Sequence, residues 1–177
     1  MVRLLAQPRT EQDKAGYPFR YAKLTREGVQ IADLLIDASS APSDGSAQPV
    51  YGLTTASAYL TDVNFEISGV GSAAVRVPTL DGAFLLRLLA LEDGPGGLKF
   101  PDCASDAASL GLLLIEDLDA LDRWRSRTGD AMDKARVLAG DLFGDSTSAG
   151  ATAAAARTSG DELLAARRVS SAIRALI

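Results

Sequence analysis

Apolar and polar positions alternate along the first 80 residues with a period of two, the pattern of half-buried β-strands. The run Tyr17–Thr25 alternates in this way, and the run Val29–Ile36 follows after a short link that ends at Gly28. Two such runs with a short glycine-containing link predict a β-hairpin. The runs Tyr59–Ile67 and Ala73–Val77 predict a second hairpin, because a glycine-containing connection again joins them.

From Pro78 onward the apolar residues recur with helical spacing. The predicted helices cover residues 80–92, 105–115, 118–143 with a break near Gly129, and 161–177. Thr79 is a suitable N-cap for the first helix, and the glycine-rich segment 94–97 ends it. The last helix carries an apolar stripe formed by Leu163, Leu164, Val169, Ile173 and Leu176.

Two segments show neither periodicity. Residues 38–50 are small and polar and include proline, so we expect a mobile loop. Residues 144–159 are rich in alanine, serine, threonine and glycine, which fits a mobile linker or a weak helix. The predicted fold class is α+β, with a small, mostly antiparallel sheet of two hairpins in residues 1–78 and a helical half in residues 79–177. A chain of 177 residues is short enough for the two parts to share one core.

The chain contains no histidine and one cysteine, Cys103. The absence of histidine excludes Ser-His-Asp and Cys-His catalysis, imidazole metal sites and histidine pH switches. A single cysteine excludes an internal disulfide framework and a multi-cysteine zinc site. A metal bound by this chain would therefore be a hard cation held by carboxylates, such as Mg²⁺.

The chain carries 18 basic and 23 acidic side chains, a net charge of −5. This balance gives no overall attraction to nucleic acid or to an anionic membrane. No apolar run approaches the roughly 20 residues that span a bilayer, and residues 1–13 lack the apolar core of a signal peptide. We therefore expect a cytoplasmic protein with no membrane partner. The abundance of alanine, glycine and arginine is typical of bacteria with GC-rich genomes.

Asp33 is the acid that least fits its predicted surroundings. On a strand it shares one face with Ile31 and Leu35, and the opposite face, with Ala32 and Leu34, is apolar as well. This pattern predicts a central, covered strand, in which a carboxylate is costly unless it has a partner or a task. The alternative is an acid near the open end of the strand that contacts water or pairs with an arginine.

Arg87 lies on the predicted helix 80–92 among apolar neighbours three and four positions away, namely Ala83, Phe84, Ala90 and Leu91. A guanidinium in an apolar stripe indicates that it faces an anion, either a carboxylate or a phosphate. The alternative is an arginine whose stem covers the core while its head reaches water.

Other charged positions have simple structural explanations. Asp106 follows Ser105 in the first turn of the predicted helix 105–115, where the helix dipole favours acids and serine caps well. An acidic cluster is expected to form a solvated face and comprises Glu116, Asp117, Asp119 and Asp122. A basic segment could contact nucleic acid, but the nearby acids favour a plain surface helix. This segment comprises Arg123, Trp124, Arg125 and Arg127.

Four pieces of the chain share an order with a known family. Gly28–Leu35 reads G-V-x-I-x-D-L-L, Val75–Pro78 reads V-R-V-P, and Leu80–Leu91 contains L-L-R-L-x-A-L. Asp106–Leu114 then reads D-x-x-x-L-x-L-L-L. This order, over residues 17–115, resembles the core and C-terminal half of the abortive-infection nucleotidyltransferase-like proteins (AbiEii type), toxins of bacterial type IV toxin–antitoxin systems.

The resemblance implies a role for each of three residues. Asp33 would match the third acid of the family's carboxylate triad and would be a metal ligand. Arg87 would match the helix lysine that contacts nucleotide phosphates, with the same charge but a different geometry. Asp106 would match an acid that helps to complete the active site. In an intact member, Mg²⁺ ions held by three carboxylates activate a hydroxyl and neutralise the triphosphate during nucleotidyl transfer.

The chain departs from the family in the 32 residues before Asp33, which contain neither the Gly-Ser turn nor the Asp-x-Asp pair. One carboxylate cannot hold two metals, so we do not expect this chain alone to catalyse the family reaction.

Three hypotheses follow. The chain is part of a split nucleotidyltransferase completed by a partner protein, or a degenerate relative that binds a nucleoside triphosphate or an antitoxin through Arg87. In the third, it is a non-enzymatic α+β interaction protein. The missing acids favour the second over the first.

Overall fold

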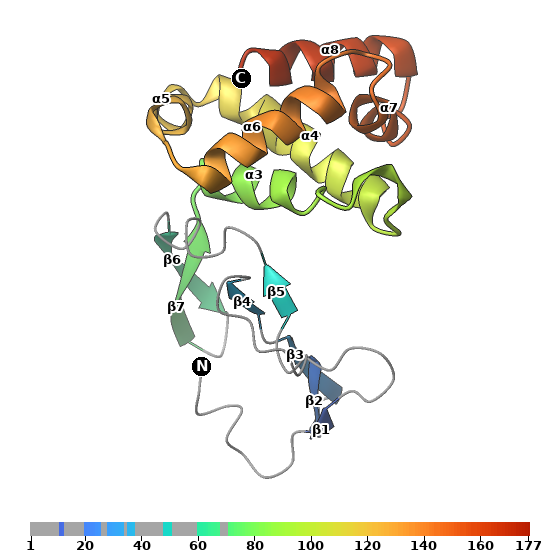
Figure 1. Cartoon of the computed structure of the whole chain (residues 1–177). Coiled ribbons are helices and arrows are strands. Elements are labelled where there is room, and N and C mark those ends of the chain that lie inside the picture. Colours follow the sequence, from blue (N-terminus) through green and yellow to red (C-terminus); the bar gives the residue numbers. More distant parts are fainter. Residues whose placement is uncertain are drawn as a thin grey trace. The chain divides into compact units, whose positions relative to one another are not determined.

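The computed structural model describes residues 60–67 and 71–177 and, in the preceding chain, the strand segments 11–12, 20–25, 28–33, 35–37 and 48–50. The protein is α+β, as predicted (Figure 1). Its residues form two compact units, Met1–Leu53 and Thr54–Ile177. The second hairpin therefore belongs with the helices, whereas the change of periodicity predicted a boundary after residue 78. The hairpin joins the helical unit because its second strand runs almost directly into the first helix.

The first unit contains the first predicted hairpin. β2 (Arg20–Thr25) and β3 (Gly28–Asp33) pair antiparallel, and β1 (Glu11–Gln12) pairs with the other edge of β2. Among the described strands β3 is therefore an edge strand, and the prediction of a central strand is wrong in this respect. Two apolar faces indicate that a strand is covered above and below, but they do not specify how many strands flank it.

A separate parallel pair of strands follows in the same unit. β4 (Leu35–Asp37) pairs with β5 (Gln48–Val50). The run predicted as one strand, Val29–Ile36, is thus divided between two sheets. β5 lies at the end of the predicted loop 38–50, where Pro49 concealed the strand because proline is confined to edges and ends of strands. The rest of that predicted loop, residues 38–47, lies outside the described residues.

The second unit contains the second predicted hairpin, which is confirmed. β6 (Leu60–Ile67) and β7 (Gly71–Pro78) pair antiparallel over their whole lengths. Gly71 has a φ of 120°, a left-handed conformation that favours glycine at the start of β7. An exposed ion pair joins the strands, with Nε of Arg76 3.4 Å from Oδ1 of Asp62.

α3 (Leu80–Leu89) follows β7 with only Thr79 between them. Thr79 occupies the predicted N-cap position, but its hydroxyl makes no capping hydrogen bond. The helix ends at Leu89, before the predicted Glu92. The backbone beyond it tightens into hydrogen bonds between residues three apart, and a 3₁₀ helix (Gly94–Gly96) follows.

α4 (Phe100–Glu116) begins earlier than the predicted start at Ser105. Pro101 stands in its first turn, where proline is tolerated because the N–H groups there have no helical partner. The preceding glycines and this proline concealed the start of the helix in the sequence. Asp106 consequently lies inside α4 and not in its first turn, so the helix-dipole explanation for this acid is wrong.

The predicted long helix 118–143 is broken as expected. α5 (Leu118–Ser126) and α6 (Asp130–Phe143) are separated at Gly129, whose φ is 112°. The carboxylate of Asp117 caps α5 by accepting a hydrogen bond from the backbone N–H of Ala120 at 3.0 Å.

α7 (Ala149–Ala155) occupies part of the segment predicted as a linker or a weak helix. It packs against α4, α6 and α8, and several of its alanines are buried. A Cβ added at Gly150 would lie 2.7 Å from the backbone oxygen of Leu142 and 2.8 Å from the ring of Phe143. The small residues of 144–159 therefore permit close helix packing, which corrects the linker interpretation.

α8 (Glu162–Arg174) is capped by Asp161, whose carboxylate accepts hydrogen bonds from two backbone N–H groups of the first turn. The predicted apolar stripe is only partly buried. Its buried members are Val169, Ile173 and Leu176, and its exposed members are Leu163 and Leu164. Helical spacing assigns residues to one face, but it does not tell how far the neighbouring helices cover that face.

The core of the second unit lies among its helices, where α4 packs against α3, α7 and α8 (Figure 1). Trp124 and Phe84 are buried there, with ring centroids 4.8 Å apart. Gly111 of α4 lies against Ile173 of α8, and a side chain at this position would collide with it. The helices thus form one core, and most of their charged residues lie on the outer faces.

Candidate functional site

Arg87 and Asp106 contact each other across the packed helices α3 and α4. Nη2 of Arg87 lies 3.2 Å from Oδ2 of Asp106, and the two side chains are 47% and 52% exposed. The anion that Arg87 faces is therefore a carboxylate, one of the two that its apolar surroundings predicted. Its head also reaches water, as the alternative prediction required. The pair is open to a ligand from solvent.

Local structure explains why these two residues meet. Arg87 lies in the last turn of α3, where the helix dipole favours a cation. The short connection after α3 returns the chain, so that α4 packs beside it. Asp106 lies on an exposed position of α4 rather than on the face that carries the buried Ala104 and Ala107. The sequence pointed to both residues but did not predict that they would pair.

Asp33 is the last residue of β3, at the strand end that the alternative interpretation proposed. Its partner in the antiparallel register is Arg20 of β2. The side chain of Asp33 lies outside the described residues. Asp33 belongs to the unit Met1–Leu53, and Arg87 and Asp106 belong to the unit Thr54–Ile177. The structure thus brings together two of the three predicted site residues.

The fully buried acid of the described part is Asp81, which the sequence did not single out. Asp81 lies in the first turn of α3 and has no exposed surface. Its carboxylate forms ion pairs with Nη2 of Arg127, itself buried, and with Nε of Arg123 at 3.4 Å. An acid in a first turn usually faces water, so only the packing of α5 over α3 could reveal this burial.

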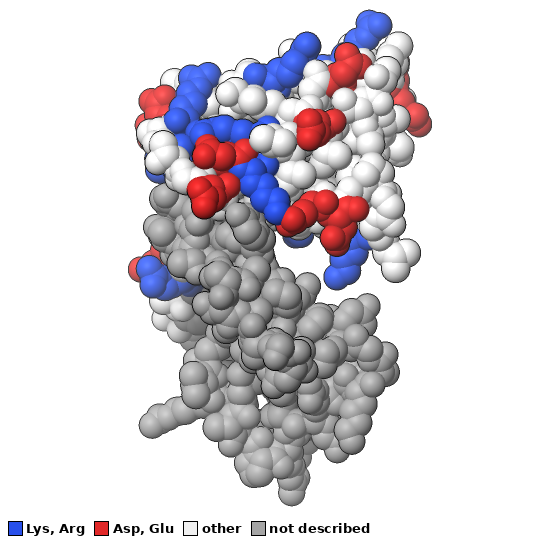
Figure 2. Space-filling view, viewed as in Figure 1, with Lys and Arg blue, Asp and Glu red and all other residues white. Residues whose placement is uncertain are grey.

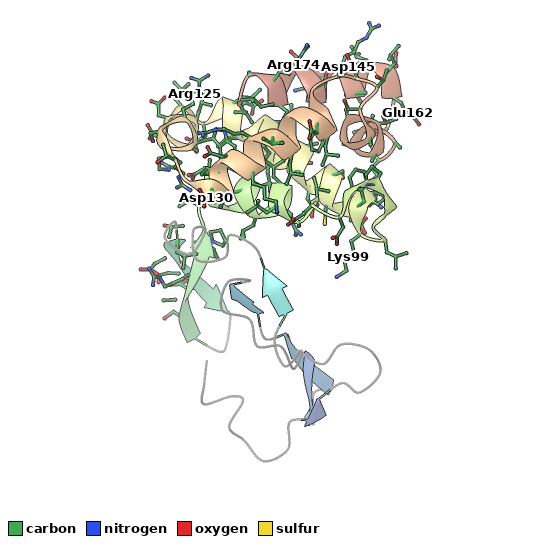
Figure 3. All side chains as sticks on the ribbon, in the orientation of Figure 1. Lys99, Arg125, Asp130, Asp145, Glu162 and Arg174 are labelled. Atoms are coloured by element: carbon green, nitrogen blue, oxygen red, sulfur yellow. The ribbon has the colours of Figure 1, made fainter. Side chains whose placement is uncertain are left out.

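The basic segment of α5 consequently differs from the predicted plain surface helix. Trp124 is buried, and its Nε1 donates a hydrogen bond to the backbone oxygen of Leu176 at 2.8 Å. Arg125 is exposed and donates a hydrogen bond to the backbone oxygen of Ala175 at 3.4 Å (Figure 3). These hydrogen bonds hold α5 against the backbone of Ala175 and Leu176. They leave no exposed indole ring on which a base could stack.

A second exposed ion pair lies on the same helix as Asp106. Arg157, just after α7, pairs with Asp102, which precedes Asp106 by about one turn of α4. The side chains of Arg157 and Asp102 are 48% and 61% exposed, close to the values for Arg87 and Asp106. The two pairs therefore differ in position but not in exposure or charge.

The outer face of the helical unit carries both signs of charge. Figure 2 shows acidic and basic side chains interspersed on the face in view. The predicted acidic cluster is solvent-exposed, as expected, at Glu116, Asp117, Asp119 and Asp122. Lys99, at the N-cap position of α4, is also exposed (Figure 3).

One surface carboxylate has a perturbed pKa. The backbone N–H of Thr147, and then its hydroxyl, donate hydrogen bonds to Asp145 at 2.8 Å each and hold the pKa of this carboxyl below its ordinary value. Arg174 adds a weaker electrostatic contribution in the same direction. These hydrogen bonds form a local turn between α6 and α7 and explain the shift without a ligand.

The described residues contain no group of three or more histidine, cysteine, aspartate or glutamate side chains that could hold a metal ion. Among the same residues, no helix has both the length and the apolar character needed to cross a membrane.

Comparisons of the chain with family models, with curated proteins and with solved structures found no match.

Proposed function

We propose that this chain is a nucleotidyltransferase-like protein of a toxin–antitoxin or defence-type system, and that it binds a nucleoside triphosphate with Arg87 on the phosphates. The observation that supports the proposal is the exposed contact between Arg87 and Asp106. The sequence resemblance assigns both residues to one site, although they come from different helices. That assignment requires the two side chains to lie close together, as they do.

The chemistry of Arg87 suits a phosphate ligand. A guanidinium keeps its charge at all physiological pH values and offers five N–H donors in a planar arrangement. Among the described residues, Arg87 makes one ion pair, through Nη2. The side chain of Arg87 is about half exposed, so a phosphate group in solvent has access to it.

The proposal concerns binding, because the residues that precede Asp33 in this sequence lack the Gly-Ser and Asp-x-Asp elements. Catalysis would need acids from a partner chain, which together with Asp33 would hold Mg²⁺. A bound Mg²⁺ would neutralise triphosphate charge. The partner would be either a protein that supplies this element or an antitoxin that covers the site.

The test is a thermal-shift titration of the full chain with each of the four ribonucleoside triphosphates and Mg²⁺. A ligand that binds only the folded state stabilises it by about 2.7 kcal/mol at a hundredfold excess over Kd. We expect a concentration-dependent rise in melting temperature for at least one nucleotide, and a much smaller rise for Arg87→Ala.

Arg157→Ala is the matched control, because it removes an arginine of equal exposure that pairs with the same helix. This variant should bind nucleotide as the wild type does. An equal loss in both variants would show that general surface charge, and not a site at Arg87, attracts the ligand. No shift with any nucleotide would favour the alternative function, a non-enzymatic α+β interaction protein.

A further inference from the structure

Arg87 is already engaged by an anion that the chain itself supplies. We propose that the carboxylate of Asp106 occupies Arg87 in the free protein and that a ligand polyphosphate binds by displacing it. Asp106 would then be an internal competitor that lowers affinity for polyphosphates. This inference rests on the proposed function, and it concerns the same site.

The geometry of the pair permits displacement. A single contact, between Nη2 and Oδ2 at 3.2 Å, joins Arg87 to Asp106, and about half of each side chain is exposed. Ion pairs of this kind are weak, because water solvates both partners once they separate. A polyphosphate carries more charge than one carboxylate and can contact several guanidinium donors at once.

The buried ion pair of the same helix shows the contrast. Asp81 has no exposed surface and is held by Arg127, which is also buried. If Asp81 and Arg127 separated, both charges would stay buried away from water, so a ligand cannot readily replace either partner. Among the described residues, three arginine–aspartate pairs involve α3, and of these only Arg87–Asp106 combines an exposed cation with an exposed anion.

The charge of Asp106 also opposes a phosphate directly. A polyphosphate bound to Arg87 would lie within a few ångströms of this carboxylate, and like charges at such a distance repel each other. Asparagine has nearly the same shape without the charge. Asp106→Asn therefore removes both the competitor and the repulsion, and it leaves Arg87 in place.

The experiment measures the Kd of inorganic triphosphate by isothermal titration calorimetry at constant ionic strength. The proteins are the wild type, Asp106→Asn, Asp102→Asn and Arg87→Ala. We expect Asp106→Asn to bind about two- to five-fold more tightly, the change that corresponds to loss of an exposed ion pair. Asp102→Asn, the matched control one turn away, should bind as the wild type does, and Arg87→Ala should lose binding.

Two sets of results would overturn the inference in different ways. If the wild type binds triphosphate and Asp106→Asn binds it equally or more weakly, Asp106 does not compete, and the proposed function stands without it. If no protein binds inorganic triphosphate or any nucleotide, both proposals fail. A melting curve for each variant checks folding, and Asp106→Ala repeats the test with a smaller side chain if the asparagine variant is unstable.

Discussion

Replacing Asp81 with asparagine removes the charge of a fully buried carboxylate and nearly conserves its volume. In the wild type, Arg127 and Arg123 both pair with Asp81, and Arg127 has almost no contact with solvent. In the variant, the guanidinium of Arg127 stays buried beside a neutral amide. Removing one partner of a buried ion pair costs about 3–5 kcal/mol, because the other charge loses an interaction that offsets its desolvation.

The position of Asp81 in the first turn of α3 adds a smaller favourable interaction with the helix dipole, about 0.3–1 kcal/mol. Arg123 is half exposed and recovers its hydration when the carboxylate is lost. We therefore expect Asp81→Asn to lower the free energy of unfolding by at least about 3 kcal/mol. This is a large share of the roughly 5–15 kcal/mol that stabilises a typical domain.

Urea denaturation followed by circular dichroism at the helical band measures this loss, with the slope of the transition used to check that the same surface unfolds. The control is Asp62→Asn, which breaks an exposed ion pair with Arg76. We expect the control to change stability by less than about 1 kcal/mol. Equal losses in the two variants would refute the conclusion that the Asp81 pair is a buried interaction.

A double variant separates the net contribution of the Asp81–Arg127 pair to stability from the cost of removing only one of its charges. Asp81→Leu combined with Arg127→Met replaces both charges with apolar side chains, a change that is often neutral or stabilising for buried ion pairs. The backbone oxygen of Arg127, which accepts a hydrogen bond from Nη2 of Arg136 at 2.9 Å, is retained. We expect the double variant to be more stable than Asp81→Asn. A double variant that is the less stable of the two would contradict this explanation.

Two further predictions concern α7 and its entry. Gly150→Val should lower stability by about 1–3 kcal/mol, measured by thermal denaturation, because the added side chain meets the backbone of Leu142 and the ring of Phe143; an unchanged melting temperature would contradict the close packing. Hydrogen bonds from Thr147 lower the pKa of Asp145 from its ordinary value of 3.8. These bonds therefore stabilise the folded protein fully above pH 3.8, and this contribution is lost as pH falls through the lowered pKa. Carboxyl NMR titration should show Asp145 titrating below pH 3.8 and closer to it in Thr147→Val.

Local periodicity predicted most of the elements. Both hairpins, the break at Gly129 and the start of the last helix near Asp161 follow from residues close together in the sequence. The errors arose where a local signal had two meanings. Small residues in 144–159 suggested a linker, yet at Gly150 they permit contact between helices. Glycine and proline before α4 suggested a loop, yet proline is compatible with the first turn of a helix.

The charged residues were harder to predict, because burial depends on distant parts of the chain. Arg87 and Asp106 stood out, one for its apolar neighbours and the other through the family resemblance, but their contact depends on how α3 packs against α4. The position of Asp81 in a first turn is typical of an exposed acid, but in the fold its carboxylate is buried and pairs with Arg127. No rule based on neighbouring residues identifies that pairing, since its partners lie more than 40 residues along the chain.

The hydrogen bond from Trp124 to Leu176 has a spectroscopic consequence. Trp124 is the single tryptophan of the chain and lies in the unit Thr54–Ile177, whereas three of the four tyrosines, Tyr17, Tyr21 and Tyr51, lie in the unit Met1–Leu53. Emission excited at the indole band therefore reports on the helical unit and on the attachment of its last residues. Tyrosine absorbance reports mainly on the other unit, so the chain carries separate optical signals for its two parts.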